Sequence, residues 1–374
     1  MHEDAYDHRV GRLTSLTHKG HSVDRKALKR ILGRVLVYVV MLLIVVAIIK
    51  LVPRIWEDVK EGNPLYVALA IPFEILSIGG YVLLFWAVYG AAARRKDQGA
   101  DAARPLTLKE SMQLTTSRLA LGDTLPGGGA TGFAVQFWAL SRAGFTAAQI
   151  SRTTTAFLVL SNTVMTVMIF ILGVLIGTGL TAGHLHPAIT WIPAAIALAV
   201  IITLLLFAKK GAKFVPPPPD ARPPHTGKHA KWRNMMWSIT VRLPPGANDA
   251  MHIIRRPYAI IGMLANPGFD FCAFYLGYAA VGDPLPLSVM LMAYFIGQVG
   301  SLIPLPGGIG GVQGLAIGVL IAGGAPAHIA TAGVLVWTGV ALGTQIVWGF
   351  WQYWGLHKSM KKWEAEGDQP PVAT

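Results

Sequence analysis

Several apolar stretches long enough to cross a lipid bilayer constrain this chain more than any other feature. A stretch of about 20 apolar residues spans the hydrocarbon core, where only helices and closed barrels satisfy their own backbone groups. Of the 374 residues, 53% are hydrophobic and only 14% are charged, which is not the balance of a soluble globular domain. We therefore expect an all-α, polytopic integral membrane protein.

The loops between these stretches differ in charge, and this difference predicts their orientation. The loop 181–187 contains neither Lys nor Arg, whereas Arg94 and Arg95 follow one stretch and Lys358 follows the last. Because basic loops stay in the cytoplasm, we expect a multi-pass protein of the cell inner (plasma) membrane with both termini cytoplasmic. The clearest of about seven expected spans are 31–52, 65–90, 153–180, 188–208, 257–281 and 329–355.

The same pattern divides the chain into a membrane domain, 31–355, between a cytoplasmic arm, 1–30, and a cytoplasmic tail, 356–374. Inside the domain, the basic segment 209–256 is expected to be a cytoplasmic loop. Part of it has apolar residues at helical spacing among Lys and Arg, which predicts an amphipathic helix on the anionic inner leaflet or a helix packed on the domain. These residues are Trp232, Met235, Met236, Ile239 and Leu243.

One short motif occurs twice. Leu125-Pro126-Gly127-Gly128 returns 180 positions later as Leu305-Pro306-Gly307-Gly308, and Gly144 meets Gly324 at the same offset. Proline lacks an N–H and glycine lacks a side chain, so a helix stops or bends here. Breaks in corresponding halves of a membrane protein are typical of a binding site at the membrane midplane, and close-packing kinks are the alternative.

The flanking charges predict opposite orientations for the two broken segments. Basic residues lie on both sides of 107–142, which predicts a hairpin that enters from the cytoplasm and returns, although two short spans also fit. The segment 287–322 lies between loops without Lys or Arg, so its hairpin would enter from outside. Three expected crossings separate the hairpins, which makes them two broken (re-entrant) hairpins forming an inverted repeat, as in many transporters.

Four ionisable residues fall within the apolar regions: Glu74, Arg118, Asp123 and Asp270. Each costs about 2.5–3.5 kcal/mol to insert, so each needs a reason to be there. Arg118 suits a phosphate through bidentate hydrogen bonds, which predicts a polar cavity for an anionic group. In the alternative, Arg118 pairs with one of the acids and holds helices together, and Asp123 caps a helix.

Helix N-termini after the two breaks would add to such an anion site, because their free N–H groups favour negative charge. Gln136 and Gln313 follow the breaks and could contribute amide groups. The candidate substrate-binding residues are Arg118, Asp123, Pro126, Gly127, Gly128, Gln136, Pro306, Gly307, Gly308 and Gln313, with Glu74 and Asp270 as intramembrane acids.

Several other classes of function find no support in the sequence. There is no hydrolase elbow, Walker loop or HExxH motif, and the one cysteine, Cys272, excludes an internal disulfide. The net charge of +13 belongs to the loops, so we expect no nucleic-acid partner. We also expect no enzyme activity, no cofactor and no metal site.

The broken motifs resemble those of a known family. Leu125 to Gly132 followed by Arg142-Ala143-Gly144, and Pro304 to Gln313, are similar to the lysylphosphatidylglycerol synthase transmembrane domain, a flippase-like family. The resemblance covers about 31–355. It implies a domain that translocates aminoacylated phosphatidylglycerol in the best-known members, where a separate soluble domain makes the lipid. Only a short tail follows the last span here, which implies a stand-alone translocase rather than a synthase.

The second motif departs from the family at Gln313, where the family usually has Glu. A neutral amide does not attract a cationic aminoacyl head group as a carboxylate does. We therefore expect movement of an anionic phospholipid or a polyprenyl-phosphate-linked substrate between leaflets. The alternatives are a non-catalytic subunit that presents lipid to a partner transferase and a small-solute secondary transporter.

Overall fold

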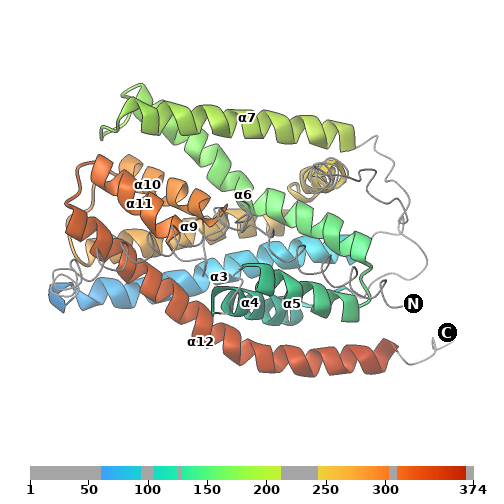
Figure 1. Cartoon of the computed structure of the whole chain (residues 1–374). Coiled ribbons are helices and arrows are strands. Elements are labelled where there is room, and N and C mark those ends of the chain that lie inside the picture. Colours follow the sequence, from blue (N-terminus) through green and yellow to red (C-terminus); the bar gives the residue numbers. More distant parts are fainter. Residues whose placement is uncertain (1–59, 94–104, 125–128, 212–242, 303–309, 368–374) are drawn as a thin grey trace, which may run out of the picture. The chain divides into compact units, whose positions relative to one another are not determined.

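The computed structural model describes residues 60–93, 105–124, 129–211, 243–302 and 310–367. These residues are helical apart from short turns, and no strand occurs among them. The expected all-α class is thus confirmed for the described part of the chain (Figure 1). The elements are α3 (Pro64–Ala93), α4 (Leu108–Thr124), α5 (Gly129–Arg142), α6 (Ala147–Gly177), α7 (Pro187–Gly211), α9 (Pro257–Ala279), α10 (Leu287–Val299), the 3-10 turn η2 (Gly300–Leu302), α11 (Gly311–Ala322) and α12 (Ala327–Gly367).

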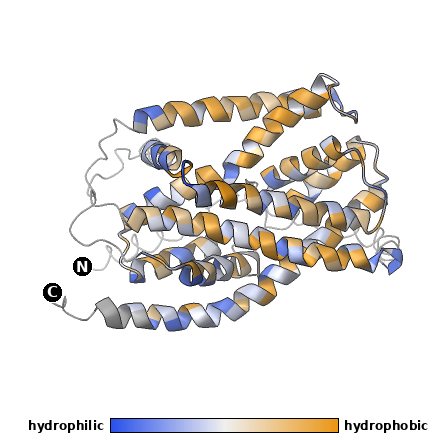
Figure 2. Ribbon diagram, turned by 180° about the vertical axis from the view of Figure 1, so that it is seen from behind, coloured by the Kyte–Doolittle hydropathy of each residue, from blue (hydrophilic) through white to orange (hydrophobic). Residues whose placement is uncertain are grey.

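Five of these helices, α3, α6, α7, α9 and α12, are long and apolar enough to cross a membrane. Figure 2 shows hydrophobic residues along most of their length. They coincide with the five expected spans that fall within the described ranges, and the sixth, 31–52, lies outside them. The protein is therefore a multi-pass membrane protein, as the apolar stretches predict.

Local sequence explains where several of these helices begin. Thr146 accepts the backbone N–H of Gln149, and the Gln149 side chain accepts the N–H of Thr146, which together form a capping box before α6. Thr107 and Glu110 make the same reciprocal pair before α4. Pro257 occupies the first turn of α9, where its missing N–H costs no hydrogen bond.

The broken segments form two helical hairpins. A Cβ added at Gly132 of α5 would lie 2.6 Å from the carbonyl oxygen of Arg118 in α4, and one added at Gly311 of α11 would meet Gly300 before it. Each second helix therefore folds back along the first, as Figure 1 shows. The four helices have 17, 14, 13 and 12 residues, fewer than the ~20 that a full crossing takes. The joining residues 125–128 and 303–309 lie outside the described ranges.

The packing of the helices has a pairwise pattern. The helices that follow the hairpins are α6 and α12, and each packs against the opposite hairpin: α12 lies along α4, and α10 lies along α6. The most extensive contact joins α3 to α9, the helices that precede the hairpins. The contact of α4 with α12 in one series thus has its counterpart in the contact of α10 with α6 in the other.

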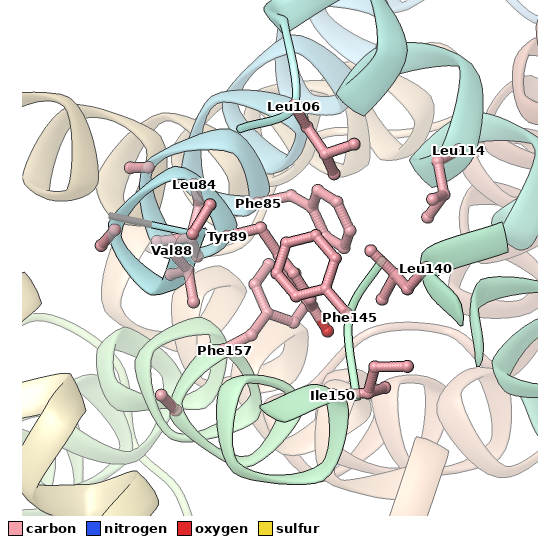
Figure 3. Packing of buried hydrophobic residues seen from close by; sticks show 14 of the residues in the cluster. Leu84, Phe85, Val88, Tyr89, Leu106, Leu114, Leu140, Phe145, Ile150 and Phe157 are labelled. Carbon is pink, nitrogen blue, oxygen red and sulfur yellow. The ribbon is translucent and has the colours of Figure 1, made fainter. Parts of the chain in front are cut away.

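Two apolar clusters support the two hairpins. The first contains Phe85 and Tyr89 of α3, whose stacked rings lie 4.2 Å apart, together with Phe145 and Phe157. Figure 3 shows these rings converging beside Leu140 of α5. The second is built around α9, α10, α11 and the first half of α12, with Phe274 and Met292 fully buried. The polar residues discussed below border these clusters.

The ends of the predicted domain are described only in part. Of the basic segment 209–256, the structure describes residues 209–211 and 243–256, so the proposed amphipathic residues before Leu243 lie outside it. Helix α12 continues beyond the expected span, to Gly367. In this extension Leu356, Met360 and Trp363 are buried in the first apolar cluster, which ties that part of the predicted tail to the membrane domain.

Candidate functional site

Arg118 of α4 is held by neutral groups on two neighbouring helices. Its Nη1 donates to Oε1 of Gln136 in α5 at 3.0 Å, and its Nη2 donates to the Tyr81 hydroxyl of α3 at 2.9 Å. The guanidinium also lies 4.5 Å from the ring centroid of Phe133, a cation–π contact. Since α4 and α5 form the first hairpin, the fold-back brings these residues together.

A second layer of hydrogen bonds fixes Gln136. Its Nε2 donates to the Tyr89 hydroxyl at 2.7 Å, and that hydroxyl pairs with Oγ1 of Thr154 in α6, also at 2.7 Å. Gln136 is 1% exposed, so its orientation is set by these partners and not by water. The amide therefore presents its oxygen to Arg118.

The positive charge of Arg118 has no anionic counterpart among the described side chains. No described carboxylate lies within ion-pair distance, and neither Glu74 nor Asp270 contacts it. The alternative pairing of Arg118 with Glu74 or Asp270 is therefore wrong, whereas its pairing with Asp123 stays untested because that side chain lies outside the described part. A guanidinium has five N–H donors, and described residues accept from two of them. Arg118 is thus a partly buried cation with spare donors.

Glu74 and Asp270 form a separate polar cluster between α3 and α9. Asp270 accepts hydrogen bonds from the Tyr294 hydroxyl at 2.8 Å, the Trp337 indole N–H at 2.8 Å and the Gln298 amide at 3.1 Å. Glu74 is 2% exposed and accepts from Gln345 through Oε1 at 3.2 Å. The two carboxyl groups are within hydrogen-bonding reach of each other. The structure therefore divides the predicted polar cavity into a cationic and an acidic site.

The structure brings none of the remaining predicted site residues into contact with Arg118 within the described part of the chain. Gln313 accepts the N–H of Gly310 at 2.8 Å, so it caps its own helix, α11, and its Nε2 reaches Thr338 of α12 at 3.4 Å. The side chain of Asp123 lies outside the described part. So do the motif residues Pro126, Gly127, Gly128, Pro306, Gly307 and Gly308, whose role stays a prediction.

Comparison with known proteins identifies the family. Residues 31–349 match the model of the lysylphosphatidylglycerol synthase transmembrane region. The chain belongs to this family. No curated protein matches it. Membership confirms the resemblance of the two broken motifs and supports a function related to membrane lipids.

An apolar groove lies between α3, α4 and α12. It has a volume of about 580 Å³ and is walled by Ile75, Leu76 and Met112, with exposed Lys109 near the start of α4. The indole N–H of Trp348, which also lines it, is buried and has no acceptor among the described residues. Apolar walls with one cation near the start of α4 suit a lipid chain below an anionic head group.

Sequence reasoning missed several groups that shape these sites. Tyr81, Tyr294 and Trp337 have no local signature that separates them from ordinary apolar residues. A bidentate ion pair joins Arg152 of α6 to Asp249, with N–O distances of 2.6 and 2.7 Å. Arg152 is one of the basic residues that follow the segment 107–142, and nothing local in the sequence pairs it with Asp249. Within the described ranges, no three His, Cys, Asp or Glu side chains gather as a metal site.

Proposed function

We propose that this protein moves an anionic lipid, either a phospholipid or a polyprenyl-phosphate-linked molecule, between the leaflets of the inner membrane. Arg118 contacts the phosphate during this movement. Both termini lie in the cytoplasm, and the protein acts by binding and release, without covalent catalysis. A partner transferase would supply or consume the lipid.

The observation that carries this proposal is the charge of Arg118, which meets no carboxylate among the described side chains. Burying a cation without a counterion is costly, and a structural role would be met at lower cost by an ion pair or an apolar residue. Here the two hydrogen bonds and the Phe133 ring orient the guanidinium, and because these groups are neutral they do not cancel its positive charge. A phosphate oxygen would take the remaining N–H donors in charge-assisted bonds.

The arrangement of the hairpins supports a translocation mechanism. We propose that the series α3 to α6 and α9 to α12 form an inverted repeat, with the hairpins entering from opposite sides. Their cross-contacts are matched, α4 with α12 and α10 with α6, as expected for two halves that rock against each other. Such rocking would expose Arg118 to each leaflet in turn.

The groove between α3, α4 and α12 supports a lipid as the substrate. Its apolar walls suit acyl or prenyl chains, which stay in the bilayer while the head group crosses. Lys109 at the groove adds a cation at the predicted cytoplasmic end, where an anionic head group would first arrive. Such apolar walls offer a small hydrophilic solute no hydrogen-bond partners.

A leaflet-translocation assay in proteoliposomes tests the proposal. Wild-type protein is reconstituted with labelled phosphatidylglycerol, phosphatidylcholine or a polyprenyl phosphate, and the label that reaches the other leaflet is measured. We expect transport of an anionic lipid that is lost in Arg118→Ala and partly kept in Arg118→Lys. Arg142→Ala is the matched control, because Arg142 is exposed and lies over the Trp138 ring.

Two outcomes would contradict the proposal. If wild-type protein moves none of these lipids although they bind, the protein presents lipid to a partner and does not translocate it. If Arg118→Ala transports at the wild-type rate while remaining folded, Arg118 is a structural residue and the anion site is elsewhere.

A further inference from the structure

The acidic cluster between α3 and α9 has an excess of acceptors over donors. Three donors serve Asp270, whereas Oε2 of Glu74 is buried and meets no N–H or O–H donor among the described residues. An unmet buried carboxylate oxygen is costly, since it loses water and gains nothing in return. The group within reach of Glu74 is the carboxyl of Asp270.

Two carboxyl groups hydrogen-bond to each other only if one of them carries a proton. Like charges at this separation in a low-dielectric interior repel strongly, so a shared proton is the simplest way to satisfy both. In that state the O–H of one carboxyl donates to the other, and the unmet oxygen of Glu74 gains a partner. Release of the proton leaves two facing carboxylates.

The described groups around the pair include no cation that would replace the proton. Helix α10 contributes the Tyr294 hydroxyl and the Gln298 amide, and α12 contributes the Trp337 indole and the Gln345 amide. The guanidinium of Arg118 in α4 is directed to Tyr81 and Gln136. Among the described residues, Tyr294 is thus the one other titratable group in contact, and it donates to Asp270.

Both carboxyl groups are enclosed by protein groups. Glu74 is 2% exposed, and the Asp270 oxygens accept hydrogen bonds from Tyr294, Gln298 and Trp337. The pair also joins α3 and α9, so its protonation acts directly on the contact between the two halves of the chain.

We propose that Glu74 and Asp270 together bind one exchangeable proton, and that its binding and release drive the lipid movement. This rests on the proposed function, since the proton supplies the energy for the transport carried by Arg118. The protonated pair stabilises the α3–α9 contact, and the deprotonated pair loosens it by repulsion. One half-cycle thus takes up a proton on one side of the membrane and the other half-cycle releases it on the opposite side.

The site itself is tested without any transport, by infrared difference spectroscopy of the protein in phosphatidylcholine nanodiscs between pH 5 and pH 9. We expect a protonated carboxyl band that disappears as the pH rises. Glu74→Gln should remove it while preserving the fold, because the new amide donates to Asp270 as the proton does. Asp283→Asn, in an exposed loop, is the matched control and should keep the band. A band that ignores pH, or that survives Glu74→Gln, overturns the proposal.

Coupling is tested by the steady-state distribution of labelled lipid in proteoliposomes with an imposed pH gradient. If one proton moves per lipid, one pH unit shifts the ratio between leaflets by up to about tenfold. Glu74→Gln should abolish the shift and keep lipid binding. A wild-type ratio that ignores the pH gradient, or follows a sodium gradient instead, overturns the coupling. If transport persists without such a shift, the proposed lipid translocation still holds and only the proton coupling is overturned. If the carboxyl band titrates but no lipid is transported, the proposed translocation is overturned and the proton site still holds.

Discussion

Gly144 and Gly324, 180 positions apart, end the second helix of each hairpin in the same way. Their φ angles are 86° and 100°, and the residue after each donates its N–H to the carbonyl five positions back, at 3.1 Å from Phe145 and 3.0 Å from Ala325. This is the glycine-terminated cap that helices commonly adopt. The equivalent positions of the two motif copies therefore have equivalent backbone conformations.

Replacing either glycine by alanine should destabilise the protein. A residue with a Cβ pays about 1–2 kcal/mol in the left-handed region. At Gly324 no atom lies within 4 Å of the added Cβ, so the cost there is conformational alone. The loss of stability is measured by unfolding of the purified protein in mixed micelles. Gly314→Ala, in the exposed face of α11 with equal space around it, is the control and should be neutral or slightly stabilising. Equal stability of Gly324→Ala and Gly314→Ala would contradict the cap.

The adjacent glycines Gly79 and Gly80 of α3 should respond differently to the same substitution. A Cβ on Gly80 would lie 2.5 Å from the backbone nitrogen of Asn266 in α9, whereas a Cβ on Gly79 meets nothing within 4 Å. Gly80→Ala must push α3 and α9 apart, which should cost about 1–3 kcal/mol. Gly79→Ala should stay within about 1 kcal/mol of wild type. Thermal unfolding of both variants in one detergent decides between these expectations, and similar values would mean that the two helices are not in backbone contact.

Much of the fold follows from local sequence. Apolar length alone located the spans that correspond to α3, α7 and α9. The span expected at 153–180 begins earlier, at Ala147, because the Thr146–Gln149 capping box starts the helix and Arg152 finds an acid partner. The opposite orientation of the hairpins depends on membrane sides and stays a prediction.

The site depended on tertiary contacts that no local pattern encodes. Gln136 was recognised as an amide that could contribute to the site, but its bond to Arg118 requires the fold-back of α5 on α4. Glu74 and Asp270 were recognised as intramembrane acids, but nothing in the sequence pairs residues so far apart. Polar residues within apolar stretches can be recognised from the sequence, whereas the packing of the helices determines which of these residues contact one another.

Trp363 links the end of α12 to the start of α4. It is 4% exposed, and its indole N–H donates to Oε1 of Glu110 at 3.0 Å. Trp363→Phe removes a buried hydrogen bond to a carboxylate, which should cost about 1.5–3 kcal/mol. Trp354→Phe, in the same helix with Trp354 75% exposed, should be neutral. Fluorescence-detected size-exclusion chromatography after heating compares the two, and unchanged stability of Trp363→Phe would argue against this attachment of the tail.

Gln136→Glu gives the sharpest test of the anion site, because it changes charge with almost no change in shape. The new carboxylate accepts from Arg118 in place of the amide oxygen, and the Tyr89 hydroxyl turns to donate to it, so both partners of Gln136 remain satisfied. The protein should fold and insert normally. Binding of an anionic lipid, measured by native mass spectrometry, should fall by about tenfold or more, since the guanidinium is now neutralised by its own neighbour, an effect worth about 1.4 kcal/mol or more. Gln149→Glu, at the capping box of α6, is the control for an added carboxylate in the same domain. Undiminished binding in Gln136→Glu would show that the charge of Arg118 is not what holds the lipid.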